Sequence, residues 1–304
     1  MTIHKELLKK TPSISIVIPC YNEAKGVAHS LDKIIENLKE RYNYEIITIN
    51  DGSTDETLKV LEEYSAEKPF MQVVNNNSNL GYGASLKKGI KETNADIIVI
   101  TDADCTYPAS EIPRLVDALQ TTDMAVGARI GKKVHIPLIR RPAKWILLRY
   151  ARWLANADIK DLNSGLRAFR KQDAYQYFHI LPNGFSFTST ITIAMHINNY
   201  SIRYLPINYY KRVGNSSIRP IRDTLAFFSL VLRTTMYFNP LKVFGILASF
   251  LILLSIIISI TCKYFYGTIP DILTITLFMS GLNCIGLGVI CDLINRKIDN
   301  SKSL

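Results

Sequence analysis

Two carboxylates at positions i and i+2 can hold a divalent cation when a rigid element presents them together. Asp102 and Asp104 directly follow residues 97–100, a run of Ile and Val. Such a run is typical of a strand buried on both faces, at whose end the two charges would repel each other without a cation between them. Hard ions such as Mg²⁺ or Mn²⁺ take oxygen ligands, often carboxylates together with substrate phosphates. The alternative is a capped turn before a helix near residue 109.

Two more polar clusters also follow apolar runs. Residues 21–23 follow the run 13–19, and residues 51–55 follow the run 44–49. In the second cluster, the Thr or Asp at its end can cap the next helix. Asp51 precedes the glycine, so we expect its carboxylate to be free to accept hydrogen bonds from a base or a ribose.

The first 130 residues alternate between strand-like and helix-like patterns. We expect strands at 13–19, 44–49, 71–74 and 96–101, and helices at 24–40, 55–64 and 82–93. This order predicts an α/β fold with a doubly wound, mostly parallel sheet and helices on both faces. Ligands of such sheets bind beyond the carboxyl ends of the strands, where all three polar clusters fall.

Residues 81–86 begin like a dinucleotide-binding fingerprint. However, Leu86 stands where the last glycine belongs, and the segment follows the third expected strand rather than the first. A nicotinamide site is therefore not expected here.

Residues 18–23, 50–55 and 102–104, in this order and spacing, resemble the motifs of glycosyltransferase family 2, the inverting enzymes of the GT-A fold. Residues 161–167 and 212–216 are similar to segments of the dolichyl-phosphate mannose synthases and their bacterial polyprenyl-phosphate relatives. The resemblance covers about residues 14 to 219. It implies a Rossmann-like GT-A domain that binds a UDP- or GDP-linked sugar and Mg²⁺ or Mn²⁺.

The resemblance also implies a role for individual residues. The nucleotide sugar would be bound by Pro19, Tyr21, Glu23, Asp51, Asp102, Ala103 and Asp104, and the metal by Asp102 and Asp104. The acceptor phosphate and lipid side would be lined by Asp161, Ser164, Arg167, Arg212 and Arg219. The catalytic residues would be Asp104, Arg129 and Arg212. This chain departs from the family at Thr106, Thr190 and Ser217, where Gln, Glu and Lys are frequent; a third metal ligand and the sugar therefore stay open.

The distribution of charge bears on the acceptor. Residues 129–222 contain seventeen Lys and Arg but three acids, and Glu111 is the last Glu of the chain. An acceptor hydroxyl needs a positioned base, commonly Asp or Glu, whereas a phosphate monoester with a second pKa near 6 is already ionised. The scarcity of carboxylates and the excess of basic residues favour a phosphate as the acceptor. The resemblance implies that this phosphate belongs to a polyprenyl lipid, undecaprenyl or dolichyl phosphate.

Three alternatives stay open at this point. One is transfer of a single sugar to a hydroxyl of a glycolipid or polysaccharide precursor, with Asp161 as the base. Another is a processive polysaccharide synthase, because residues 149–153 match the loose pattern of such enzymes; they precede residues 163–165, however, and no Glu-Asp pair stands before them. The third is an inactive nucleotide-sugar-binding membrane partner, which would be expected to lack a metal carboxylate.

Two uncharged runs near the carboxyl end, residues 243–262 and 272–291, are each twenty residues long. Twenty helical residues span about 30 Å, the hydrocarbon thickness of a bilayer, so we expect a transmembrane hairpin over 243–294. The basic residues of the tail 295–304 and of the preceding domain predict that both lie in the cytoplasm. Five scattered Cys residues suggest neither a disulfide framework nor a zinc site.

The expected organisation is a tail over 1–12, a catalytic domain over 13–219, a juxtamembrane amphipathic helix over 220–239, the hairpin and a cytoplasmic tail. Residues 137–156 would form an amphipathic helix in the membrane interface, or else pack against the catalytic domain. No signal peptide is expected in the first residues. The partners would be the donor, the lipid acceptor and the bilayer, most simply the bacterial plasma membrane, but no nucleic acid. A homo-oligomer and a flippase partner are left open.

Overall fold

The computed structural model describes residues 14–39, 41–132, 141–211 and 234–300. The chain divides into two compact units, residues 1–224 and 225–304. Arg212, Ser217, Arg219 and most of the expected juxtamembrane helix lie outside the described residues.

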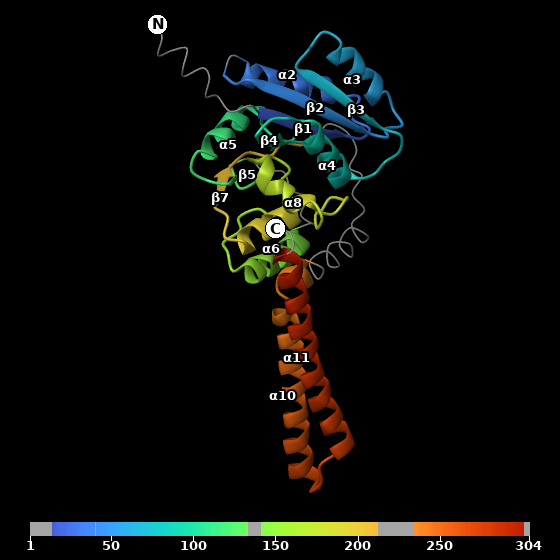
Figure 1. The fold of residues 1–304 in the computed structure, drawn as a ribbon, viewed down its shortest axis with the longest axis vertical. Coiled ribbons are helices and arrows are strands. Elements are labelled where there is room, and N and C mark those ends of the chain that lie inside the picture. The colour runs from blue at the N-terminus through green and yellow to red at the C-terminus, as the bar shows by residue number, and fades with distance from the viewer. Residues whose placement is uncertain (1–13, 40, 133–140, 212–233, 301–304) are drawn as a thin grey trace. The chain divides into compact units, whose positions relative to one another are not determined.

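A seven-stranded sheet forms the centre of the first unit, in the order β3-β2-β1-β4-β6-β5-β7 (Figure 1). The strands are β1 Ile14–Cys20, β2 Tyr44–Asp51, β3 Met71–Asn76, β4 Ile97–Ile100, β5 Met124–Ala128, β6 Arg167–Arg170 and β7 Ile202–Pro206. β6 pairs antiparallel with both β4 and β5, and the other described pairs are parallel. The expected doubly wound, mostly parallel α/β sheet is confirmed.

Helices cover both faces of this sheet. The helices of this unit are α2 Val27–Leu38, α3 Thr57–Ser65, α4 Tyr82–Glu92, the 3₁₀ turn Ala109–Glu111, α5 Ile112–Ala118, α6 Arg141–Ala155, α7 Lys171–Tyr175 and α8 Phe187–Ile197. Side chains of a strand alternate between faces. Accordingly, Ile16 and Ile18 join the core cluster with α2, whereas Val17 faces α4, where a Cβ on Gly89 would lie 2.5 Å from it.

The register of the central strands determines where the polar loops begin. Cys20 pairs with Asn50, so β1 and β2 end side by side, and Val17 pairs with Ile100, the last residue of β4. Because the three strands are parallel, the loops that follow them leave from the same edge of the sheet.

The α6 helix packs against α8 and buries Ala151 and Leu154. Its other face exposes Trp145 and Ile146, each 62% accessible. A helix is therefore present over Arg141–Ala155 of the expected range 137–156, with one side packed on α8 and apolar side chains exposed on the other. Residues 137–140 lie outside the described residues, and the place of α6 in the membrane interface stays a prediction.

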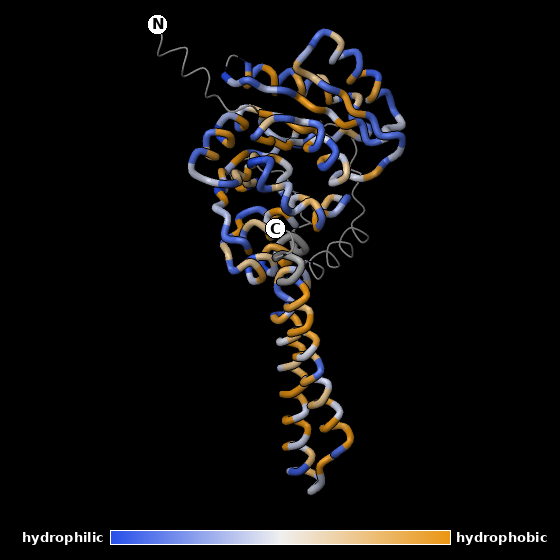
Figure 2. Tube along the Cα trace, in the orientation of Figure 1, coloured by the Kyte–Doolittle hydropathy of each residue, from blue (hydrophilic) through white to orange (hydrophobic). Residues whose placement is uncertain are grey.

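The second unit contains two long helices, α10 Pro240–Tyr266 and α11 Asp271–Asn300. Both are long and apolar enough to cross a membrane, and most of their residues carry the hydrophobic colour in Figure 2. They pack closely where Gly281 meets Ile252 and where Gly288 meets Phe244. Ser255 Oγ also donates to the Thr274 carbonyl over 2.8 Å. The expected hairpin of two apolar helices is present.

Candidate active site

The loops that follow β1 and β2 are joined to each other by hydrogen bonds. The Asn22 N–H donates to Ser53 Oγ over 3.1 Å, and the Thr54 N–H donates to Asn22 Oδ1 over 2.8 Å. The Asp55 carboxylate accepts from the Thr57 N–H at the start of α3 and from the Ala24 N–H. Asp55, one of the two residues expected to cap this helix, thus satisfies the first N–H of α3, although the N-cap position itself is Glu56. Beside it, Glu23 is buried, while Pro19 and Tyr21 are half-buried.

Asp51 lies at the end of β2 and is only 3% exposed. Contrary to expectation, its carboxylate is not free. It accepts from Asn76 Nδ2, the Leu80 N–H and the Gly81 N–H, each over 2.9 Å. Since a carboxylate offers about four lone-pair positions, Asp51 first organises the loop before α4 and retains room for about one further donor. Its contact with a nucleotide base stays a prediction.

The backbone conformation at residue 52 explains why the motif 50–55 has a glycine there. Its φ of +65° is a backbone conformation that other residues rarely adopt, and a Cβ there would lie 2.4 Å from the Ser78 carbonyl carbon. The loops after β2 and β3 therefore touch through backbone at this point.

Asp102 and Asp104 follow β4 and each accepts a hydrogen bond from a hydroxyl group. The Tyr82 hydroxyl donates to Asp102 Oδ1 over 3.0 Å. Thr106 Oγ1 donates to Asp104 Oδ1 over 2.7 Å, and the Thr106 N–H donates to the same oxygen over 3.1 Å. Asp104 and Thr106 thus form a local turn, which orients a carboxylate that is 6% exposed. No described side chain caps the helical turn that begins at Ala109, so the cap considered as an alternative is not seen there.

This pair of carboxylates fits the binding of a hard divalent cation together with a substrate. Among the described residues, no group of three or more His, Cys, Asp or Glu side chains could hold a metal alone. Two carboxylates supply part of an oxygen shell, and substrate phosphates and water commonly supply the rest for Mg²⁺. Thr106, whose role the sequence left open, turns its hydroxyl toward Asp104.

Arg129 and Asp161 form a buried ion pair. Arg129 Nε and Nη2 donate to the two Asp161 oxygens over 2.7 and 2.9 Å, and the Arg129 N–H adds a third bond over 3.0 Å. The Asp161 side chain is fully buried and that of Arg129 is 12% exposed. The Asn163 N–H donates to the same carboxylate over 3.3 Å, which makes four donors. Donors that hold the charged form of a carboxylate disfavour its protonation, which argues against Asp161 as the base for an acceptor hydroxyl.

Ser164 and Arg167 are both completely buried. Ser164 Oγ donates to the Gly127 carbonyl over 2.5 Å. The Arg167 guanidinium donates to the Ser164 carbonyl, the Thr188 carbonyl and Thr192 Oγ1. Burial lowers the pKa of this arginine from its usual value. Both side chains are thus enclosed by protein groups near β6 and α8. That they line the acceptor side, as the resemblance implies, stays a prediction.

The sequence did not single out Tyr82, Tyr107 and Tyr209, yet burial and, to a lesser extent, the Asp102 charge raise the pKa of all three. The Tyr107 hydroxyl accepts from the Gly165 N–H over 2.7 Å, and its ring packs edge-on against Tyr209. Burial raises the pKa of Tyr82 well above its usual value, and the nearby Asp102 charge raises it further, so this hydroxyl keeps its proton. The one available signal for Tyr82 was its place in the glycine-rich segment 81–86.

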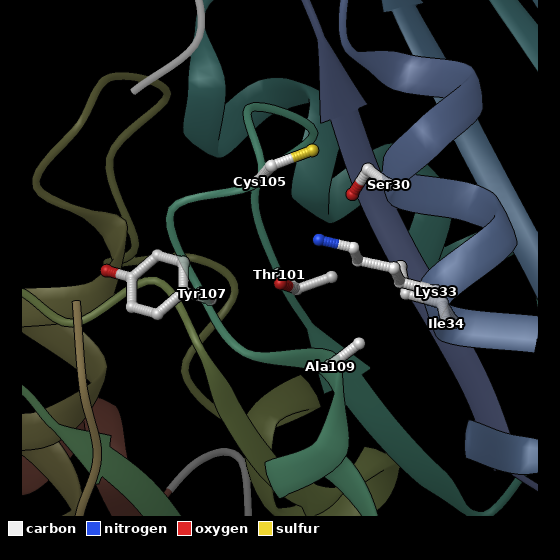
Figure 3. Close-up of a pocket in the computed structure, with 7 residues that line it drawn as sticks. All are labelled: Ser30, Lys33, Ile34, Thr101, Cys105, Tyr107 and Ala109. Atoms are coloured by element: carbon white, nitrogen blue, oxygen red, sulfur yellow. The ribbon is translucent and has the colours of Figure 1, made fainter. Parts of the chain in front are cut away.

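A small pocket lies between α2 and the segment 101–109. It is lined by Ser30, Lys33, Ile34, Thr101, Cys105, Tyr107 and Ala109. Figure 3 shows the Lys33 side chain reaching from α2 toward Thr101 and Cys105. Thr101 and Cys105, next to the two aspartates in the sequence, line it, whereas Asp102 and Asp104 do not.

Known proteins resemble this chain in sequence and in fold. The model of the family described as "Glycosyl transferase family 2" matches residues 15–178. The chain belongs to glycosyl transferase family 2. Undecaprenyl-phosphate 4-deoxy-4-formamido-L-arabinose transferase of Pseudomonas fluorescens is 30% identical to this family member, over 77% of this chain and 67% of the relative.

A second relative is the dolichol-phosphate mannosyltransferase of Pyrococcus furiosus, 31% identical over 59% of this chain and 52% of the relative. The chain spans about half the length of several curated relatives that it matches. A solved structure, glucosyl-3-phosphoglycerate synthase of Mycobacterium tuberculosis with Mn²⁺, UDP-glucose and phosphoglyceric acid, has a TM-score of 0.57 at 18% identity and covers 77% of this chain and 84% of that one. This likeness shows the GT-A fold, and the expected family is confirmed.

Proposed function

We propose that this protein transfers a sugar from a UDP- or GDP-linked donor to a polyprenyl phosphate at the cytoplasmic face of a membrane. The observation that carries the proposal is the Asp102–Asp104 pair at the end of β4, in a family 2 chain that ends in two membrane-length apolar helices. Relatives named as undecaprenyl-phosphate and dolichol-phosphate sugar transferases support the choice of acceptor.

On the donor side, Asp51, Pro19, Tyr21 and Glu23 would bind the nucleoside, and Asp102, Ala103 and Asp104 the diphosphate. A Mg²⁺ or Mn²⁺ ion, when bound, would supply positive charge to the departing diphosphate; the Mn²⁺ in the related synthase complex supports this assignment. The hydroxyl groups of Tyr82 and Thr106 would hold the two carboxylates in their orientations.

On the acceptor side, the described carboxylates between Arg129 and β6 are already paired. Asp161 binds Arg129, and Asp158 binds Lys160 and Arg152. This arrangement favours a nucleophile that needs no base. A phosphate oxygen would attack the anomeric carbon with its lone pair, and the bond from that carbon to the diphosphate oxygen would break. The nucleoside diphosphate would leave with the electron pair, and the configuration would be inverted.

Arg129 would stabilise charge on a phosphate, with Arg212 as its predicted partner. A guanidinium carries five N–H donors, of which Asp161 takes two. The ion pair would therefore fix the guanidinium in place and leave donors for phosphate oxygens. Such preorganised donors stabilise developing charge without reorganising during the reaction.

At the membrane, α10 and α11 would anchor the chain, and the exposed Trp145 and Ile146 of α6 would lie in the interface. The Arg149 Cζ atom lies 5.7 Å from the centre of the Trp145 ring. A cation thus stands beside an exposed apolar side chain, as is typical of interfacial helices. The bacterial plasma membrane is the proposed location, with the catalytic domain in the cytoplasm.

The test is an assay on membranes that contain the full chain. Radiolabelled UDP- and GDP-sugars are supplied with undecaprenyl or dolichyl phosphate, with and without EDTA. Label should enter the lipid with one donor, and EDTA or Asp104→Asn should abolish transfer, while Asp117→Asn, an exposed carboxylate paired with Arg41, should not. Full activity in EDTA would overturn the metal role, and no transfer from any donor would overturn the function.

A further inference from the structure

We propose that Tyr82 is a positioning residue: its hydroxyl fixes the Asp102 carboxylate, so that the glycine-rich segment at the start of α4 sets the geometry for the donor diphosphate. The inference rests on the proposed role of Asp102 as a metal and diphosphate ligand. It gives a function to the one motif, residues 81–86, that a nicotinamide site could not explain.

The Asp102 carboxylate is held from two sides. On one side the Tyr82 hydroxyl donates to Oδ1 over 3.0 Å. On the other side lies the backbone of Gly165, where a Cβ would approach both carboxylate oxygens to 2.9 Å. Asp102 sits in a loop and is only half-buried, so its side chain would have other rotamers available without these contacts.

Tyr82 is itself held in place by the backbone around it. Gly81 and Gly83 allow the close approach of residues 182–184, since Cβ atoms there would lie 2.6 Å from the Asn183 carbonyl oxygen and 2.2 Å from the Pro182 carbonyl oxygen. The Ala84 N–H donates to the same Asn183 oxygen over 2.9 Å. The Tyr82 ring also stacks on Phe185, with ring centroids 5.8 Å apart and planes inclined by 18°.

The same segment also contacts Asp51, the residue proposed to bind the nucleotide base. The Leu80 and Gly81 N–H groups donate to the Asp51 carboxylate, and the next residue, Tyr82, donates to Asp102. Residues 80–82 therefore connect the carboxylate proposed for the base with the carboxylate proposed for the diphosphate. A rigid link of this kind fixes the separation of two ligand groups before the donor binds, which lowers the cost of ordering them.

Tyr82→Phe tests this role because phenylalanine keeps the ring and its stacking on Phe185 but removes the hydroxyl. The affinity of the purified full chain for UDP and GDP is measured in Mn²⁺ and in EDTA. The ratio of the two affinities should fall by about tenfold in Tyr82→Phe, the size expected for losing one hydrogen bond to a charged group. The affinity in EDTA should stay unchanged, as should both affinities in Tyr200→Phe, whose hydroxyl donates to Gln176 instead.

The outcomes separate this inference from the function on which it rests. If the ratio is unaffected by Asp102→Asn, the proposed metal role itself is overturned. If Asp102→Asn lowers the ratio but Tyr82→Phe leaves it unchanged, only the role of Tyr82 is overturned. An equal loss of affinity in Mn²⁺ and in EDTA would show that Tyr82 is merely structural, because loosening α4 would also disturb the Asp51 contacts.

Discussion

Replacing Asp161 with Asn tests whether the Arg129–Asp161 pair is a structural unit that also fixes a catalytic arginine. Asn is nearly isosteric but uncharged, so the Arg129 guanidinium would lose its counter-charge in a place where it is 12% exposed. Breaking a buried ion pair by removing one partner costs about 3–5 kcal/mol. We take the lower end, about 3 kcal/mol, because Asn keeps one acceptor oxygen. For a domain of this size 1 kcal/mol lowers Tm by roughly 2–4 °C, so the transition should fall by roughly 6–12 °C.

The assay is thermal unfolding of the full chain in detergent, followed by circular dichroism. Replacing both partners, as Arg129→Leu with Asp161→Leu, should destabilise the domain less than Asp161→Asn alone, because no uncompensated charge remains. Asp158→Asn is the matched control, since that carboxylate is exposed and pairs with Lys160, and it should unfold close to the wild type. An Asp161→Asn protein that has the Tm of the wild type but loses all transfer activity would refute the structural role of the pair. It would also restore Asp161 as a candidate base.

Three further predictions concern the loops and α6. Gly52→Ala should weaken nucleotide binding by at least about tenfold, because the new Cβ would lie 2.4 Å from the Ser78 carbonyl carbon at a φ of +65°; an unchanged affinity by equilibrium dialysis would contradict it. Thr106→Val should raise the Mn²⁺ concentration for half-maximal transfer, while Thr106→Ser, which keeps the hydroxyl that donates to Asp104, should not; equal behaviour of the two variants would refute the orienting role. Both Trp residues of the chain, Trp145 and Trp153, lie on α6. Brominated lipids should therefore quench the intrinsic tryptophan fluorescence, because α6 is proposed to lie in the membrane interface. An absence of quenching would place α6 away from the bilayer.

Much of the site's location could be predicted from the sequence because it depends on local patterns. Apolar runs followed by polar residues indicate strand ends, and the parallel order brings Glu23, Asp51 and Asp102 to one edge of the sheet. The same reasoning predicted the sheet over the first 130 residues and the two apolar helices. These features follow from periodicity and length, which a single sequence displays directly.

The contacts that orient these side chains could not be predicted, because they join residues far apart in the chain. Asp51 was expected to be free, yet the N–H groups of residues 80 and 81 donate to it. Arg167 was assigned to the acceptor side by resemblance, and nothing in the sequence indicated that carbonyl and hydroxyl groups of Ser164 and α8 would accept from its guanidinium. Burial of a charged group becomes tolerable only when such partners converge, and no short-range pattern reports that convergence. The antiparallel strand β6 escaped prediction for a similar reason, since its four residues carry no strong alternation.

A lipid phosphate as the acceptor is the assignment on which the proposed mechanism depends. A direct comparison supplies the purified full chain with its preferred nucleotide sugar, Mn²⁺ and either a polyprenyl phosphate or the corresponding polyprenol. We expect rapid transfer to the phosphate, no transfer to the alcohol, and a glycosyl phosphate whose anomeric configuration is inverted relative to the donor. Transfer to the alcohol at a comparable rate, or a product that retains the donor's configuration, would contradict this assignment.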